Sequence, residues 1–320
     1  MNSKNSLANA AKLALKEYMG ITEDETLLVI TDASTNEVGR ALYEAGLELC
    51  EEAFYLEMRD REVSGQEPPP QIAELMQKVD VVMCPTAKSL THTKARIYAS
   101  KQGVRVGTMP GINAGIMKRC FSADPQQIIS TNEKLQKILR SAKEVKLVSK
   151  LGTDMTFSAS GRKIISSTGV LRNIGESGNV PSGEVYFAPA EGVSNGKLVI
   201  DGSISGIGML ESPVFINVVN GFATDITGGK EADMLSKMLS KVGHYAHAVA
   251  EFGVGTNPKA KISGMILEDE KVLGTVHVAF GNNMSMGGNI NVPIHIDCVI
   301  KSPSFYCDGT PIMLDGKLII

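Results

Sequence analysis

The sequence predicts an α/β protein in which a doubly wound parallel α/β domain precedes a strand-rich α+β domain. Over the first 130 residues, short apolar runs alternate with helical patterns, which is typical of parallel strands joined by crossover helices. After residue 145 the pattern changes to short strands separated by glycines, which favours antiparallel hairpins. We therefore expect two domains, residues 1–145 and residues 146–320.

The strands of the first domain are expected where apolar, β-branched residues run together between turn residues. Helical periodicity separates them over residues 37–53 and 72–78. In doubly wound sheets ligands collect at the carboxyl ends of the strands, here residues 32–35 and 86–93. The four expected strands are Thr26–Asp32, Ala53–Met58, Val79–Thr86 and Gly103–Met109.

Three further helices and one turn complete the expected organisation. Residues 1–20 are interrupted by lysines, so they favour an amphipathic helix over a signal peptide. A long connector helix is expected over 124–148. Another is expected over 228–252, where acidic residues come early and lysines late, in agreement with a helix dipole. The acidic trio at 268–270 is interpreted as a charged hairpin turn.

The composition narrows the possible partners. A formal net charge of −3 provides no field suited to binding a polyanion, so we expect no nucleic-acid partner. No uncharged run approaches the ~18 residues of a membrane span. The five cysteines are scattered, odd in number and without a CxxC pair, which favours a reduced, cytoplasmic setting.

The last quarter of the chain carries the pattern most typical of a chemical site. His295 and Asp297 are separated by one residue, so in a strand both side chains project to the same face. His277 lies in a similar apolar strand, and the segment between them is a loop that allows the two strands to pair. Glu251 has apolar neighbours, and a buried carboxylate needs a cation or a proton. Imidazoles and carboxylates together suit a divalent metal, although a hydrogen-bonded core position remains open for each histidine.

For the other candidate residues, an ordinary structural role is an alternative to a functional one. Glu184 opens a strand after a Pro-Ser-Gly turn and could equally be a strand-edge glutamate. His92 follows the third expected strand, where it either accompanies a capped helix start or orients a substrate. His244 and His247 are interpreted as helix-face residues, and Cys298 should point away from Asp297 on the opposite strand face.

Several familiar catalytic patterns do not occur. The sequence contains no GxSxG, no Walker phosphate loop and no HExxH, and the segment ASTNEVG is not GxGxxG. A nucleotide-binding role for the first strand-turn-helix unit is therefore disfavoured.

Four segments together resemble the aminopeptidase T family of metallopeptidases, often called leucyl aminopeptidases. They are NVPSGEVYFAP, AEFGVGTNP, DEKVLGTVHVAFG and IHIDCVI. The resemblance covers the second domain well and the first more loosely. It implies a two-metal site, commonly zinc or cobalt, and cleavage of N-terminal residues from peptides. The ligands implied by the matching motifs are Glu184, Glu251, His277, His295 and Asp297.

The chain departs from that family in three respects. Met284 stands where family members carry a tyrosine, the turn before His277 differs from their DENA pattern, and their chains are usually longer. The shorter form also resembles 2,5-dihydroxypyridine dioxygenases, which hold one ferrous ion. That resemblance implies a metal-binding triad of His277, His295 and Asp297. His92 is then an acid-base candidate, and Glu184 and Glu251 orient the histidines without binding the metal.

Three functional hypotheses follow. The first is a metallo-aminopeptidase with two zinc, cobalt or manganese ions, in which Glu184 transfers protons if it is not a ligand. The second is a ring-cleaving dioxygenase with one Fe(II), acting on a dihydroxylated aromatic or pyridine substrate. The third is a degenerate metal-dependent binding protein. We expect a peptide or small-molecule substrate, no membrane partner, and a homodimer, as implied by the family.

Overall fold

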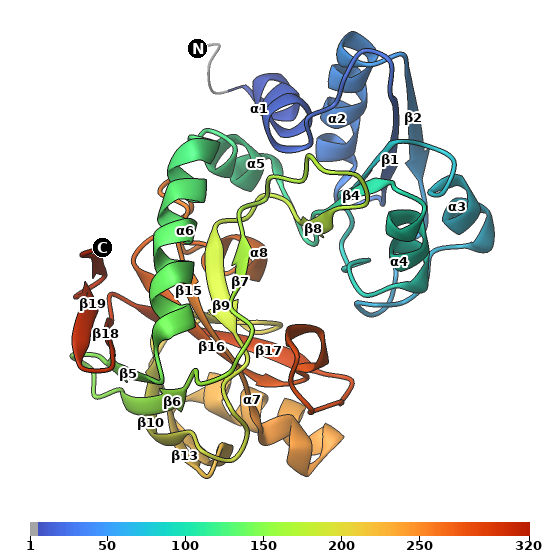
Figure 1. The fold of residues 1–320 in the computed structure, drawn as a ribbon. Coiled ribbons are helices and arrows are strands. Elements are labelled where there is room, and N and C mark those ends of the chain that lie inside the picture. The colour runs from blue at the N-terminus through green and yellow to red at the C-terminus, as the bar shows by residue number, and fades with distance from the viewer. Residues whose placement is uncertain (1–5) are drawn as a thin grey trace. The chain divides into compact units, whose positions relative to one another are not determined.

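The computed structural model describes residues 6–320, which form two compact units (Figure 1). The first unit comprises the residues up to Gln127 together with Ser167–Ser182. The second comprises Ile128–Ser166 and Gly183–Ile320. Residue 145, where the sequence pattern changes, lies inside the second unit.

The first unit contains a five-stranded sheet whose paired strands run parallel, in the order β2-β1-β3-β4-β8. This arrangement confirms the doubly wound α/β fold expected from the sequence. The short fifth strand comes from Ser167–Ser182 and was not predicted. The strands are β1 (Thr26–Thr31), β2 (Glu52–Glu57), β3 (Val81–Cys84), β4 (Arg105–Thr108) and β8 (Ser177–Asn179). The helices are α1 (Leu7–Leu13), η2 (Ala14–Tyr18), α2 (Asn36–Leu49), α3 (Pro70–Leu75), α4 (Lys94–Lys101) and α5 (Ala114–Cys120).

Helices cover both faces of this sheet, which explains why its central strands are continuously apolar. Leu28 of β1 packs in one cluster with Ile72 of α3 and Ala95 of α4. On the opposite face, Gly46 of α2 lies so close to Leu27 that a Cβ on the glycine would be 2.5 Å from the leucine side chain. Strand β1 is thus buried on both sides.

The second unit contains two sheets built from antiparallel ladders. One has eight strands in the order β14-β13-β10-β6-β5-β18-β19-β20, and the other has seven in the order β12-β11-β17-β16-β15-β9-β7. The strands of the first are β5 (Glu144–Val148), β6 (Asp154–Ser158), β10 (Asn195–Ile200), β13 (Val214–Val219), β14 (Phe222–Thr227), β18 (Ser304–Cys307), β19 (Thr310–Leu314) and β20 (Lys317–Leu318). Those of the second are β7 (Ile165–Ser167), β9 (Glu184–Phe187), β11 (Ser203–Ile204), β12 (Gly208–Met209), β15 (Val249–Gly255), β16 (Thr275–Gly281) and β17 (His295–Lys301).

A single apolar core joins the two sheets and the helices α6 (Pro125–Ser141) and α7 (Lys230–Val242). Phe252 of β15 belongs to this core and contacts aromatic rings of the eight-stranded sheet. The Phe252 ring is 5.2 Å from that of Phe157 on β6 and 5.7 Å from that of Phe305 on β18. The apolar face of the seven-stranded sheet is therefore fixed by contacts with the eight-stranded sheet.

The structure corrects three local expectations. The connector helix α6 ends at Ser141, and residues 144–148 form β5, which pairs with β6 and β18. The helix expected over 228–252 ends at Val242, where Gly243 adopts φ +114. A 3-10 turn, η3 (His244–His247), then leads into β15, so Glu251 lies in a strand. The acidic trio belongs to α8 (Ile266–Asp269) and its C-cap, and it is buried.

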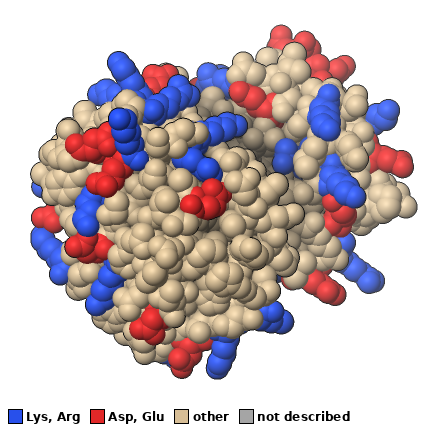
Figure 2. Space-filling model, turned by 60° about the horizontal axis from the view of Figure 1, so that its bottom comes forward, with Lys and Arg blue, Asp and Glu red and all other residues tan. Residues whose placement is uncertain are grey.

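Two observations concern the surface of the described residues. None of their helices is both long enough and apolar enough to cross a membrane. Figure 2 shows lysine, arginine and acidic side chains interspersed on the face that it presents. This distribution agrees with the small net charge of −3.

Candidate metal centre

The candidate site lies on the face of the seven-stranded sheet opposite the apolar core. Side chains in a strand alternate between faces. On β17, Ile296 and Cys298 therefore enter the core while His295 and Asp297 project to the other side. The ladder places Asp297 opposite Ala279 of β16 and His295 opposite Gly281. The same-face arrangement expected for His295 and Asp297 is thus present, and Cys298 points away as predicted.

Glycines on β15 provide the space for this site. Gly253 is paired with His277, and a Cβ on Gly253 would lie 2.0 Å from His277 Nε2. Gly255 is crossed by the backbone of the segment before β16, where a Cβ would lie 2.1 Å from Val272 O. Only a residue without a side chain allows these close approaches. The glycines of the FGVGTNP segment are therefore required by the geometry of the site.

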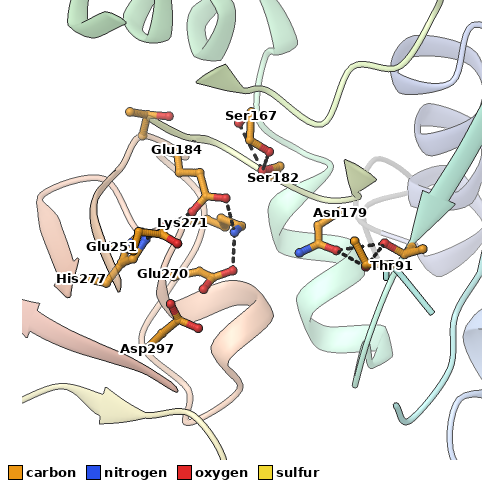
Figure 3. Close-up of polar contacts among 12 residues, drawn as sticks. Thr91, Ser167, Asn179, Ser182, Glu184, Glu251, Glu270, Lys271, His277 and Asp297 are labelled. Atoms are coloured by element: carbon orange, nitrogen blue, oxygen red, sulfur yellow. Dashed lines mark hydrogen bonds and ion pairs between the residues drawn. The ribbon is translucent and has the colours of Figure 1, made fainter. Parts of the chain in front are cut away.

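Glu251 lies between two imidazoles. Its Oε1 is 3.1 Å from His277 Nε2, and its Oε2 is 3.3 Å from His295 Nε2. Although burial acts to raise the pKa of Glu251, the hydrogen bonds with both histidines lower it overall. Figure 3 shows Glu251 and His277 beside each other, with Asp297 nearby. The carboxylate of Glu251 thus contacts both His277 and His295.

His295 is held in an orientation that leaves one ring nitrogen for the cluster. Its Nδ1 is 2.7 Å from the carbonyl oxygen of Asn282, so an Nδ1–H donates there and Nε2 faces Glu251 and Asp297. Burial acts to lower the pKa of His295, but Asp297 and Glu251 raise it well above its usual value. The His295 side chain is 31% exposed, so the centre can be reached from solvent.

Glu184 enters the cluster from β9, whose first residue it is. Its backbone oxygen accepts a hydrogen bond of 2.9 Å from Asn132 Nδ2 on α6, and Asn132 Oδ1 accepts one of 2.5 Å from Thr256 Oγ1. The side chain of Glu184 places its Oε2 3.5 Å from His277 Nε2. Burial raises the pKa of Glu184, while a nearby lysine opposes that effect.

Sequence reasoning missed Glu270 and Lys271. Lys271 Nζ donates to Glu184 Oε1 at 2.6 Å and also to Glu270 Oε1 (Figure 3). Helix α8 orients this pair because Asp269 accepts hydrogen bonds from Ser203 Oγ and from the Ser263 backbone. Burial raises the pKa of Glu270 to about 8. The only available signal in the sequence was the position of this charged run, a few residues before His277.

The potential ligand atoms fall into three overlapping groups, each within 4.8 Å. Each group contains one histidine, and Glu251 belongs to two of the groups. The groups are Glu184 with Glu251 and His277; Glu251 with His295 and Asp297; and Glu270 with His277 and Asp297. All five residues that the sequence suggested as ligands therefore come together, and Glu270 joins them.

The chemistry of these donors fits divalent cations. Four carboxyl groups surround two imidazoles, while Lys271 is the one ammonium ion in the described cluster. Glu184, Glu251 and Asp297 are each less than 10% exposed, and uncompensated carboxylates are costly at such burial. Oxygen and imidazole ligands suit zinc, cobalt, manganese and iron.

The remaining candidates lie elsewhere in the fold. His92 belongs to the first unit, where it is exposed before α4, and its acid-base role stays a prediction. The imidazole of His244 stacks on Phe222, with ring centroids 4.4 Å apart. His247 lies with His244 in η3. Met284, at the position of the family tyrosine, is 50% exposed in the loop between β16 and β17.

The profile of the 2,5-dihydroxypyridine 5,6-dioxygenase family matches residues 10–320, nearly the whole chain. The chain belongs to this family. A curated relative, the 2,5-dihydroxypyridine 5,6-dioxygenase of Pseudomonas putida, is 24% identical over 200 residues. That match covers 57% of this chain and 56% of the relative, so it spans little more than half of that protein's length.

Two solved structures share the fold over the full chain. The 2,5-dihydroxypyridine dioxygenase from Pseudomonas putida KT2440 superposes with a TM-score of 0.85 at 18% identity. The matched region covers all of this chain and 98% of that one. Wild-type AmpT from Thermus thermophilus superposes with a TM-score of 0.73 at 16% identity, covering both chains completely. The resemblance to both groups inferred from the sequence is therefore reflected in the fold.

Proposed function

We propose that this chain is a metal-dependent hydrolase of the aminopeptidase type, with two divalent cations that share Glu251. The observation that supports this most is the placement of the two Glu251 oxygens, which face different imidazoles at 3.1 and 3.3 Å. Each imidazole belongs to a different group of potential ligands. A carboxylate between two such groups is the arrangement expected at a bridged two-metal centre.

The residues divide into holding and proton-handling roles. His295 and Asp297 would hold one cation, and His277 with either Glu184 or Glu270 would hold the other, with Glu251 contributing to both. When bound, the cations would lower the pKa of a water molecule and polarise a peptide carbonyl. Glu184 or Glu270, whichever is not a ligand, is the carboxyl group placed to take the proton from that water and return it to the leaving amine. His295 is the partly exposed member of the cluster, so substrate would reach the centre from its side.

A second candidate function is favoured by the family match and the Pseudomonas putida relative. In that scheme His277, His295 and Asp297 hold one ferrous ion, and the substrate is a dihydroxylated ring. Asp297 shares one described ligand group with His277 and another with His295, which is consistent with this triad. We place the ring-cleaving dioxygenase second because it gives no ligand role to Glu251, whose two oxygens face both imidazoles.

One experiment compares the two functions directly. Protein purified anaerobically is loaded with Co²⁺, Zn²⁺ or Fe²⁺ and assayed for hydrolysis of leucyl p-nitroanilide and for oxygen uptake with 2,5-dihydroxypyridine. The proposal predicts anilide hydrolysis with Co²⁺ or Zn²⁺ and no oxygen uptake with Fe²⁺. Oxygen uptake that requires Fe²⁺, without hydrolysis, would establish the second candidate instead.

A further inference from the structure

The loop between β16 and β17 carries the group that orients His295, the partly exposed member of the cluster. The first residue of this loop, Asn282, provides the carbonyl oxygen that lies 2.7 Å from His295 Nδ1. The Asn282 side chain donates to Val292 O at 3.0 Å and accepts from Met284 N at 3.1 Å. The place of that carbonyl therefore depends on the conformation of the whole loop, residues 282–294.

Asn283, the next residue, fixes this conformation from inside the loop. It is fully buried, and its Oδ1 accepts a hydrogen bond of 2.8 Å from Ile290 N. The backbone of Gly288 packs so closely on it that a Cβ on the glycine would lie 2.1 Å from Asn283 Cγ. The other polar atom of this amide, Nδ2, donates to a residue outside the loop.

Glu191, in the turn between β9 and β10, is that acceptor. Its Oε1 accepts from Asn283 Nδ2 at 3.1 Å and from Asn289 N at 2.9 Å. One carboxylate oxygen thus connects the beginning of the loop to its later part. Burial acts to raise the pKa of Glu191, but these hydrogen bonds and the nearby Arg162 lower it overall, which favours the ionised carboxylate.

Arg162 holds Glu191 beside the loop. Its Nη1 lies 3.3 Å from Glu191 Oε2 and its Nη2 lies 3.4 Å from Glu191 Oε1, so the two side chains pair through two contacts. Arg162 Nε also donates to Ala188 O at 2.7 Å. Because the arginine side chain is 15% exposed and the glutamate side chain 26%, this pair is more sheltered than an ordinary surface ion pair. The carboxylate of Glu191 therefore has a defined position next to the loop.

We propose that Glu191 is a positioning residue for His295. It fixes Asn283, and thereby the adjacent Asn282 carbonyl, which holds the proton on His295 Nδ1 and leaves Nε2 to face the cluster. Glu191 belongs to none of the ligand groups found among the described residues. The inference rests on His295 being a metal ligand, a part of the proposed function that the second candidate function shares.

Loss of this support acts on the metal through the imidazole. A metal-binding histidine needs an acceptor for its other N–H, because that hydrogen bond sets the tautomer and the orientation of the ring. Without Glu191, Asn283 loses the acceptor of its Nδ2, and the Asn282 carbonyl is no longer held in place. A cation must then order the ring as it binds, so the affinity for the cation falls.

The first test is a titration of the metal-free protein with Co²⁺, followed by calorimetry and by the visible absorption of bound cobalt. The binding phase to compare is the one that His295→Ala removes. Glu191→Ala should weaken it about tenfold or more, whereas Glu191→Gln keeps an acceptor oxygen and should stay within about threefold of the native protein. Glu67→Ala is the matched control, because Glu67 also accepts two backbone hydrogen bonds, from Lys94 and Ala95, but in the first unit. It should bind cobalt as the native protein does.

The second readout is the Nδ1–H proton of His295, observed by NMR of the zinc-loaded protein with isotope-labelled histidine. In the native protein this proton should exchange slowly with water, because it is hydrogen-bonded to the Asn282 carbonyl. Glu191→Ala should lose the slowly exchanging signal, and Glu191→Gln should keep it. Gly288→Ala displaces Asn283 and leaves Glu191 in the chain, so it should lose the signal whether or not Glu191→Ala folds.

The possible results separate this inference from the proposed function. A folded Glu191→Ala protein that binds cobalt as well as Glu67→Ala does, and keeps the slowly exchanging proton, would overturn the inference. A native protein that binds no cobalt, or that loses none on His295→Ala, would overturn the proposed function and this inference with it. A single cobalt ion that is lost on His295→Ala would contradict only the two-cation centre, and the Glu191 comparison would still decide the inference.

Discussion

Gly253 lies directly opposite His277 in the antiparallel ladder between β15 and β16, and the imidazole occupies the space that a side chain at 253 would fill. The Cβ of any other residue would lie 2.0 Å from His277 Nε2. That nitrogen is also the one that faces Glu251 and Glu184. Hence the position of this ligand atom depends on the absence of a side chain on the neighbouring strand.

Replacing Gly253 with alanine should displace the His277 ring and weaken cation binding. We expect Gly253→Ala to lower cobalt affinity at the His277 position about tenfold or more, and to cost about 1–3 kcal/mol of stability through overpacking. Gly178→Ala in β8 is the matched control, because its nearest contact would be an ordinary 3.7 Å. Equal cobalt affinity in the two variants would show that the glycine does not set the ring position.

Asn132 is expected to support the site from a distance. It is fully buried and links α6 to the backbone of Glu184 and to the hydroxyl of Thr256. Asn132→Ala leaves these groups without their partner, so we expect a loss of about 1–3 kcal/mol in the free energy of unfolding. Urea denaturation measures this loss. Exposed Asn217 provides the control, and a loss as small as that of Asn217→Ala would contradict a buried anchoring role.

His295→Ala should abolish activity under either proposed reaction. The variant removes a ring nitrogen that lies 3.3 Å from oxygens of both Glu251 and Asp297. We expect a fall in kcat/KM of at least about 100-fold, together with loss of bound metal. His244→Ala removes an imidazole that stacks on Phe222 outside the cluster and should keep its metal. If the His295→Ala protein keeps its activity and its bound metal, His295 is not a metal ligand.

Cation binding should strengthen as the pH rises. In the metal-free protein burial acts to lower the pKa of His277, but Glu251 and its neighbours raise it to about 9, and the pKa of His295 is raised as well. These raised pKa values favour the protonated imidazoles, so a cation must displace their protons. Asp297, with a pKa lowered to about 2, stays ionised throughout.

The apparent affinity for Co²⁺ should accordingly increase between about pH 6 and about pH 9, by roughly tenfold per pH unit for each proton released. Calorimetry in buffers of different ionisation enthalpy counts these protons directly. An affinity that is constant over this range would mean that the histidines are not displaced by the metal.

The parts of the fold that followed from the sequence are those fixed by local pattern. Alternation along β17 was enough to place His295 and Asp297 together, because a strand has a period of two residues. The parallel sheet followed from strands that alternate with helices. By contrast, residues 144–148 and 249–252 continued helical patterns, and pairing with distant strands made them strands instead.

Lys271 and Glu270 show why part of the site could not be predicted. A run of charged residues normally indicates solvent exposure, and here the charges are buried because Glu184, which is 87 residues away in sequence, pairs with the lysine. Likewise, no local pattern indicated that Ser177–Asn179, a segment after the connector helix, would complete the sheet of the first unit. Both features depend on contacts that appear only in the folded chain.

The most direct test of the account is the metal content of the native protein and of Glu251→Gln, measured by mass spectrometry after saturation with Co²⁺ and removal of unbound metal. The bridging role of Glu251 predicts about two ions per native chain and about one in the variant. Glu231→Gln, which alters a buried carboxylate outside the cluster, should match the native protein. A single ion in both the native protein and Glu251→Gln would contradict the two-cation centre.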